Sequence, residues 1–279
     1  SWFDAVNHAF TTMATGGFSV RNTSISSYQS DAITWVIVVF TFLAGINFSL
    51  LYAVVRGRIK DALHSEELRW YLLILAITIS FICVDLHVEL GQGWYESAKD
   101  AAFQATTIMS TTGYATKDFT LWPTFSRCIL VLLMYVGGCA GSTAGGMKIS
   151  RLMLQVKSLR RELDHIIHPN RVSVITMDGQ SVDERAVTSA HMFQVAYLLI
   201  LMAGTLVVSL DVLGFTESFV ASLTCISNVG PSLGALGPMA NFAPLSWFSK
   251  LVLTLIMLMG RLELMPLLVL LSPSTWRNK

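Results

Sequence analysis

Hydrophobic and polar positions alternate in long blocks along this chain, with five apolar segments separated by polar linkers. The apolar segments cover residues 32–55, 70–88, 128–147, 186–210 and 251–271. Because about 20 helical residues cross the hydrocarbon core of a bilayer, the pattern predicts five membrane-spanning helices. The chain is therefore expected to be a multi-pass protein in contact with membrane lipid.

Three shorter stretches accompany these spans, at residues 4–15, 100–111 and 217–227. Each has about 12 residues, which is too few to cross a bilayer. We expect each stretch to enter the membrane and return to the same side.

The distribution of lysine and arginine indicates which linkers face the cytoplasm. If the short stretches enter from one side, the linkers at 56–69 and 148–185 and the C-terminus lie on the other. That side carries 13 of the 19 lysines and arginines, and an excess of these residues marks the cytoplasm. The short stretches therefore open to the outside. On the cytoplasmic side we expect a basic helix over 149–167 and a hairpin of residues 172–177 and 180–182, because Asp178-Gly179 suits a tight turn.

Composition agrees with a membrane protein and argues against other classes. Hydrophobic residues make up 53% of the 279 positions and charged residues only 13%, about half of the roughly 25% in soluble proteins. A net charge of +1 argues against a nucleic-acid partner, which requires a basic face. The chain starts at Ser1 without an initiator Met, and we expect it to be the later part of a longer protein.

The three short stretches are copies of one another. Aligned on one glycine each, they share an acid 13 residues earlier and a threonine 6 residues earlier. The aligned sets are the glycines Gly17, Gly113 and Gly230, the acids Asp4, Asp100 and Glu217, and the threonines Thr11, Thr107 and Thr224. An acid at a helix start meets the positive end of the helix dipole. Each copy therefore predicts a short helix that starts at its acid and ends at a glycine-bearing strip.

These strips are candidates for an ion filter. Non-helical backbone at membrane depth is tolerated where protein buries it or where it lines a watery cavity, and converging carbonyls can replace the water around a cation. One such strip alone is an ordinary turn, but three in register favour a pore. The predicted filter comprises Thr15, Gly16, Gly17, Phe18, Thr111, Thr112, Gly113, Tyr114, Asn228, Val229, Gly230 and Pro231, with K⁺ held at Thr15, Gly16, Thr111, Thr112, Asn228 and Val229.

Residues 137–146 hold five glycines in ten positions, near the cytoplasmic end of the third span. Each glycine costs a helix interior roughly 1 kcal/mol relative to alanine, so we expect the helix to fail here and to resume near Lys148. From the residues alone, a kinked helix and a loop remain equally open.

Arg261 lies within the fifth span, where an ionised group is costly unless it is paired or faces a cavity. Glu263 is two residues away and does not face it on a helix. Either Arg261 satisfies carbonyls of the loop or of a pore helix end, or its charge lies in the ion path and opposes cations.

Four motifs together resemble the Trk/Ktr/HKT potassium transporter superfamily, most closely its bacterial Trk-type uptake subunits. They are Thr-Gly-Gly-Phe-Ser (15–19), Ser-Thr-Thr-Gly-Tyr-Ala-Thr (110–116), Ser-Asn-Val-Gly-Pro-Ser (227–232) and Gly-Cys-Ala-Gly-Ser-Thr-Ala-Gly-Gly-Met-Lys (138–148). The resemblance implies an all-α membrane protein of repeated span–re-entrant pore helix–span units around a pseudo-fourfold pore, as in potassium channels.

The family has four such units, and each contributes one filter glycine. Three of these glycines are present here, so the resemblance implies that the first unit is missing and that the first visible unit lacks its leading span. We expect the second repeat over residues 1–64, the third over 65–170 and the fourth over 171–279.

The resemblance also implies a gate and partners. It favours an intramembrane loop under the filter that controls ion passage, together with the arginine, and we expect Arg261 to play both of its roles. The implied gate residues are Gly137, Gly138, Gly141, Ser142, Thr143, Gly145, Gly146, Lys148 and Arg261. It further implies a homodimer in the bacterial inner membrane, a cytosolic nucleotide-binding regulatory subunit of the TrkA type on the basic face, K⁺ as cargo and no organic cofactor.

Three functions compete. The first is uptake of K⁺, with Rb⁺ tolerated, through a channel-like pore. The second is a symporter that couples K⁺ to H⁺ or Na⁺ through the same filter, for which His191 and Glu263 in the fourth and fifth spans would serve as a titratable relay. The third is a membrane enzyme, but the sequence has no His-Glu-x-x-His motif and no carboxylate pair within a span. We expect channel-like uptake and no enzymatic activity.

Overall fold

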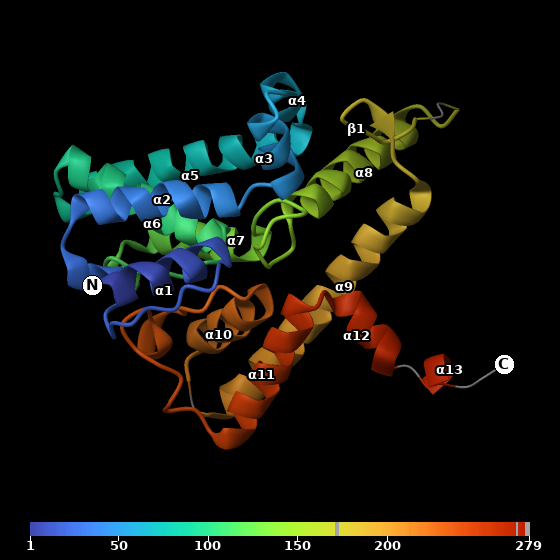
Figure 1. Cartoon of the computed structure of the whole chain (residues 1–279). Helices are drawn as coiled ribbons and strands as arrows, with labels where there is room; N and C mark the ends of the chain where they lie inside the picture. The colour runs from blue at the N-terminus through green and yellow to red at the C-terminus, as the bar shows by residue number, and fades with distance from the viewer. Residues whose placement is uncertain (171–172, 212, 272, 277–279) are drawn as a thin grey trace.

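The described residues are mostly helical, as expected. The computed structural model describes residues 1–170, 173–211, 213–271 and 273–276 (Figure 1). Its strands are the short antiparallel pair β1 (Thr176–Met177) and β2 (Gln180–Ser181). They enclose Asp178 and Gly179 as predicted, whereas Val172 of the predicted hairpin lies outside the described residues.

The first part of the chain contains a bend that the hydrophobic pattern did not predict. Its elements are α1 (Trp2–Met13), η1 (Ser24–Tyr28), α2 (Asp31–Ala44), α3 (Phe48–Val55) and α4 (Ile59–His64). The prediction of one continuous helix over 32–55 is wrong, because α2 and α3 meet at 105°. Asn47 caps α3 by accepting a hydrogen bond from the Ser49 amide at 2.8 Å. The Gly45 carbonyl, freed by the break, accepts one from the Cys139 amide at 3.0 Å.

The middle of the chain contains a long straight helix and a long loop. Its elements are α5 (Glu66–Leu90), α6 (Trp94–Met109), η2 (Phe119–Leu121), α7 (Thr124–Val136) and α8 (Ile149–Ile167). Helix α7 ends at Val136, and the backbone of 137–148 is not helical. Helix therefore fails and resumes where the glycines predicted, and the kinked-helix alternative is excluded. The predicted span 128–147 is helical only in its first part, and α8 has the predicted bounds.

The last part again combines a straight helix with a broken one. Its helices are α9 (Glu184–Val208), η3 (Ser209–Asp211), α10 (Phe215–Ser227), η4 (Gly234–Leu236), α11 (Trp247–Arg261), α12 (Leu264–Leu271) and α13 (Pro273–Trp276). The predicted span 251–271 is interrupted at Leu262 and Glu263, where Glu263 has a φ of 59°. Three of the five predicted continuous spans are therefore broken.

The broken helices occupy the same position in each repeat. The helices that precede the pore helices α6 and α10, namely α5 and α9, run unbroken for 25 residues each. The helices that follow a filter strip are all interrupted. Within the described residues, α5 and α9 are long and apolar enough to cross a membrane, and the bent pair α2–α3 also qualifies if it is counted as one span.

The pore helices form the centre of the molecule. Helix α6 packs against α2, α5 and α7, and α10 packs against α7, α9 and α11, so that α7 joins the two groups (Figure 1). Every residue from Asp100 to Thr112 is buried. Large apolar side chains such as Leu73, Ile77 and Phe81 on α5 instead point outward. This inversion suits a protein surrounded by lipid and buries strip residues such as Thr15, Thr111, Thr112 and Val229.

Candidate functional site

The three strips share one backbone conformation. Each begins with a residue of positive φ, at Thr15 (51°), Thr111 (56°) and Asn228 (59°). Two residues later the aligned glycine is again positive, at Gly17 (67°), Gly113 (80°) and Gly230 (110°). The sequence repeat is therefore a repeat of structure, in which the left-handed turn directs the chain away from the helix axis.

The aligned threonine ties each strip to its own pore helix. The Thr11 hydroxyl donates to the Phe18 carbonyl at 3.0 Å, and the Thr107 hydroxyl donates to the Tyr114 carbonyl at 3.2 Å. In the third copy the Thr224 hydroxyl accepts from the Gly230 amide at 2.9 Å. This explains why the same residue type stands at the same place in each copy.

The strips lie side by side in chain order. A Cβ added at Gly17 would lie 1.8 Å from the carbonyl oxygen of Thr112. One added at Gly113 would lie 1.9 Å from the carbonyl oxygen of Val229. Only glycine permits this approach. At Gly230, by contrast, no atom of the described chain lies within 4 Å of such a Cβ.

The predicted filter residues thus form an arc that is open beyond the third strip. The residues after the glycines differ in their surroundings. Tyr114 is fully buried and its hydroxyl lies 2.5 Å from that of Thr11 on α1, whereas Phe18 is 76% exposed. The Cδ of Pro231 lies close to Gly113.

The three aligned acids do not all begin a helix. Asp4 and Glu217 lie in the first turns of α1 and α10, as predicted. For Asp100 the prediction is wrong, because α6 starts six residues earlier, at Trp94, and Glu96 occupies its first turn. Burial raises the pKa of the Asp100 carboxyl, while Lys117, 2.6 Å away, favours its charged form. The hydrogen bond from the Ser1 hydroxyl lowers the pKa of Asp4.

The loop 137–148 lies against all three strips. Its Thr143 carbonyl accepts a hydrogen bond from the Thr15 hydroxyl at 2.8 Å, and its Gly145 amide donates to the Thr111 hydroxyl at 2.7 Å. A Cβ added at Gly145 would lie 2.4 Å from the Ser227 carbonyl oxygen. The loop therefore caps the filter from the side where the pore helices end.

The rest of the loop is held by the broken helices. The Gly141 carbonyl accepts from the Phe48 amide at 3.1 Å, and the Gly138 carbonyl accepts from the Ile149 amide at 3.0 Å. The Gly137 amide caps α7 by donating to Leu133. The break after α2 and the break after α7, which are far apart in sequence, thus meet in one layer.

Arg261 reaches this layer from the end of α11. Its Nη1 donates to the Thr143 carbonyl at 2.8 Å, so one of its two predicted contacts, with a loop carbonyl, is present. Glu263 faces the other way and pairs with Arg151 at 2.9 Å and with Lys148 at 3.6 Å. A cavity of about 150 Å³ lies here, and its lining includes Ser142, Gly146, Lys148, Arg151, Arg261 and Glu263.

Sequence reasoning missed Glu67. This buried carboxylate at the start of α5 accepts hydrogen bonds from the Ala140 amide of the loop at 2.7 Å and from the Ser150 amide of α8 at 3.1 Å. An acid in the first turn of a span is too common to reveal such a role. Gly45 and Asn47 inside an apolar block were the available sign of the break between α2 and α3.

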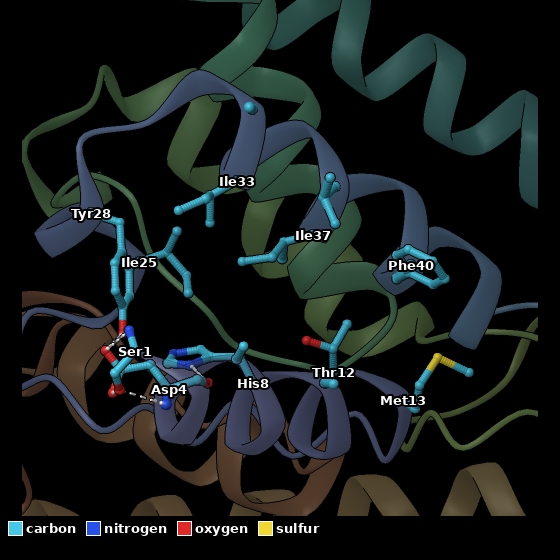
Figure 2. A pocket seen from close by; sticks show the side chains of 14 residues that line it. Ser1, Asp4, His8, Thr12, Met13, Ile25, Tyr28, Ile33, Ile37 and Phe40 are labelled. Atoms are coloured by element: carbon cyan, nitrogen blue, oxygen red, sulfur yellow. Dashed lines mark hydrogen bonds and ion pairs between the residues drawn. The ribbon is translucent and has the colours of Figure 1, made fainter.

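A groove of about 550 Å³ runs between α1 and α2. Figure 2 shows Ile33, Ile37 and Phe40 facing α1 across it, with Ser1, Asp4 and Tyr28 gathered at one end. The other pore helices α6 and α10 pack against a preceding long helix, α5 or α9. In the first copy this groove lies beside the pore helix.

Short pore helices whose ends converge, straight helices before them and broken helices after them define an all-helical membrane protein with re-entrant pore helices. A model of the TrkH family, described as a cation transport protein, matches residues 1–278. The chain belongs to this family, which consists of transport proteins rather than enzymes, as expected.

Individual relatives agree with this assignment. The chain is 32% identical over 281 residues to the Trk system potassium uptake protein TrkH of Salmonella typhimurium, and the match covers 99% of this chain and 57% of the relative. It is 32% identical over 280 residues to the Trk system potassium uptake protein TrkG of Escherichia coli, with the same coverage of 99% and 57%. The chain thus spans a little more than half the length of these relatives.

A solved structure shows the same fold. The crystal structure of the potassium transporter TrkH from Vibrio parahaemolyticus matches with a TM-score of 0.92 and 33% identity. The match covers 99% of this chain and 60% of that one.

Proposed function

We propose that this chain forms three of the four walls of a K⁺ uptake pore, which also accepts Rb⁺ and works as a channel. The observation that carries the proposal is the arc of strips, in which carbonyl oxygens of Thr112 and Val229 lie against the glycine of the neighbouring strip. Carbonyls so arranged can replace the hydration shell of a cation. The relatives are named as potassium uptake proteins, which supports K⁺ as cargo.

The open end of the arc receives a fourth strip. The space beside Gly230 and the groove beside α1 are the two places where the repeated arrangement is incomplete within the described chain. We assign residues 1–64, 65–170 and 171–279 to the second, third and fourth repeats. A helix equivalent to α5 and α9 occupies the groove, and a fourth unit of the pseudo-fourfold ring supplies the missing strip.

The gate is the loop 137–148 together with Arg261. A cation that leaves the filter meets the Thr143 carbonyl and then a cavity lined by Lys148, Arg151 and Arg261, against one acid, Glu263, in its described lining. A cluster of positive charge at close range repels cations. Conduction therefore requires the loop and Arg261 to move away from the axis.

The protein works as a homodimer in the bacterial inner membrane. Its cytoplasmic face comprises α8 and the hairpin, and a nucleotide-binding regulatory subunit of the TrkA type docks there. The basic side chains Lys157, Arg160 and Arg161 on α8 support this orientation.

Rb⁺ uptake into liposomes that contain the complete protein tests the proposal. We expect uptake that K⁺ inhibits and that needs no H⁺ or Na⁺ gradient; dependence on such a gradient would indicate symport instead. Gly113→Ala places a Cβ against Val229 and should lower Rb⁺ uptake at least about tenfold, as filter distortions of a few kcal/mol do. Gly93→Ala is the control, because its Cβ meets no described atom within 4 Å. Full uptake by a folded Gly113→Ala protein would contradict the filter.

A further inference from the structure

The aligned acids do more than begin pore helices. Asp100 on α6 forms an ion pair at 2.6 Å with Lys117, which lies in the chain that leaves the same filter strip. Asp4 on α1 lies 3.7 Å from Arg21, again in the chain after its own strip. In both copies the cation stands 17 residues after the acid and four residues after the filter glycine.

The third copy makes the same link without a cation. The residue 17 positions after Glu217 is Gly234. A Cβ at Gly234 would lie 2.1 Å from Oε1 of Glu217, and its φ is 65°. The backbone has therefore taken the place of the side chain, and the Ala235 amide donates to Glu217 Oε1 at 2.9 Å.

Each link closes a loop that contains most of a pore helix and one whole filter strip. The three links differ in burial, in distance and in the type of interaction. Asp100 is buried and Lys117 is 42% exposed, whereas Arg21 is 58% exposed at a longer distance. Exposed, loosely paired ions contribute little, and the third tie is a hydrogen bond from a backbone amide. The second strip of this chain, 111–114, therefore depends most on its ion pair.

We propose that the Asp100–Lys117 pair is a brace that fixes the position of strip 111–114 and thereby sets the preference for K⁺ and Rb⁺ over Na⁺. The inference rests on the proposed function and adds positioning residues to it. Neither side chain belongs to the filter strips. Without the ion pair, the C-terminal end of strip 111–114 is free to move toward the pore axis. Carbonyls that move inward accommodate the smaller Na⁺.

The experiment compares Rb⁺ and Na⁺ uptake by the complete protein in liposomes. Lys117→Met and Asp100→Asn each remove the pair, and we expect the ratio of Rb⁺ to Na⁺ uptake to fall about tenfold in both, a change typical of a lost discriminating contact. Rb⁺ uptake itself should persist. Lys117→Arg keeps the pair and should keep the ratio.

Lys99→Met is the matched control. Lys99 neighbours Asp100 in sequence, but it pairs with Asp31 of α2 at 2.7 Å and not with the segment that follows strip 111–114. We expect its ratio to equal that of the wild type. An equal loss of selectivity in Lys99→Met would overturn the brace, because general loosening of α6 would then explain the effect.

Uptake by the wild type distinguishes a failure of the brace from a failure of the proposed function. A wild type that prefers Rb⁺, together with a folded Lys117→Met protein of unchanged ratio, overturns the brace and leaves the proposed function intact. A wild type that carries neither ion overturns the proposed function and the brace with it.

Discussion

Arg261 has a structural contact with the loop 137–148 and carries the proposed blocking charge of the gate. Its guanidinium donates to the Thr143 carbonyl, which also accepts from the Thr15 hydroxyl of the filter. One oxygen thus joins the loop, the filter and α11. The same contact holds a permanent positive charge beside the strips, on the proposed path of the cation.

Removing this charge should increase flux. We expect Arg261→Ala to raise Rb⁺ uptake into liposomes several-fold, because the loop loses a charge-assisted hydrogen bond worth about 1.5–3 kcal/mol and the path loses its repulsion. Arg56→Ala is the control, since Arg56 contacts Tyr52 on α3 and not the loop. Unchanged or lower uptake by a well-folded Arg261→Ala protein would refute a blocking role.

Among the elements, the meeting of three broken helices decides the architecture below the filter. The ends of α2, α7 and α11 all reach the loop 137–148, through the Gly45 carbonyl, Gly137 and Arg261. The freed backbone groups satisfy one another, which is the condition for irregular backbone at membrane depth. The straight helices α5 and α9 then serve as the fixed frame.

Glu67 connects this frame to the loop. Its carboxylate accepts from two amides, those of Ala140 and Ser150. Glu67→Gln replaces charge-assisted bonds by neutral ones and should weaken the closed loop by about 1 kcal/mol, which shifts the ratio of open to closed loops about fivefold.

Cys139 reports this opening because it is fully buried within the loop. In a protein whose other cysteines are replaced, Glu67→Gln should speed the modification of Cys139 by a thiol reagent and raise Rb⁺ uptake. Glu66→Gln is the control, since Glu66 pairs with Lys157 of α8 instead. Equal modification rates in the wild type and Glu67→Gln would show that Glu67 does not hold the loop.

At the scale of the whole molecule, the three strips follow one another in chain order along an open arc. Gly17 and Gly113 each lie against a carbonyl of the next strip, and the strips follow the C-terminal ends of the pore helices, which carry partial negative charge. The proposed topology has all pore helices entering from one side, opposite to α8.

Labelling of single cysteines from each side of the membrane tests this orientation. In a cysteine-free protein, Leu121→Cys in η2 should react with an impermeant thiol reagent only from outside the cell, and Ile166→Cys in α8 only from the cytoplasm. Both positions are more than 70% exposed, at 78% and 74%. Reaction of both from the same side would refute the assigned topology.

The sequence by itself determined what depends on neighbours along the chain. The apolar blocks, the glycines after Val136, the turn at Asp178 and the threefold alignment predicted helix positions, the end of α7 and a glycine-bearing strip after each pore helix, because hydrophobic period and helix propensity act over a few residues. The basic linkers likewise predicted a cytoplasmic side.

Only the tertiary structure decided which breaks meet and which charges pair. Glu67 and Ala140 are 73 residues apart, and Arg261 and Thr143 are 118 apart. The bend after α2 depends on a loop almost one hundred residues later. Contacts over such separations are chosen by the packing of whole helices, which no local pattern records.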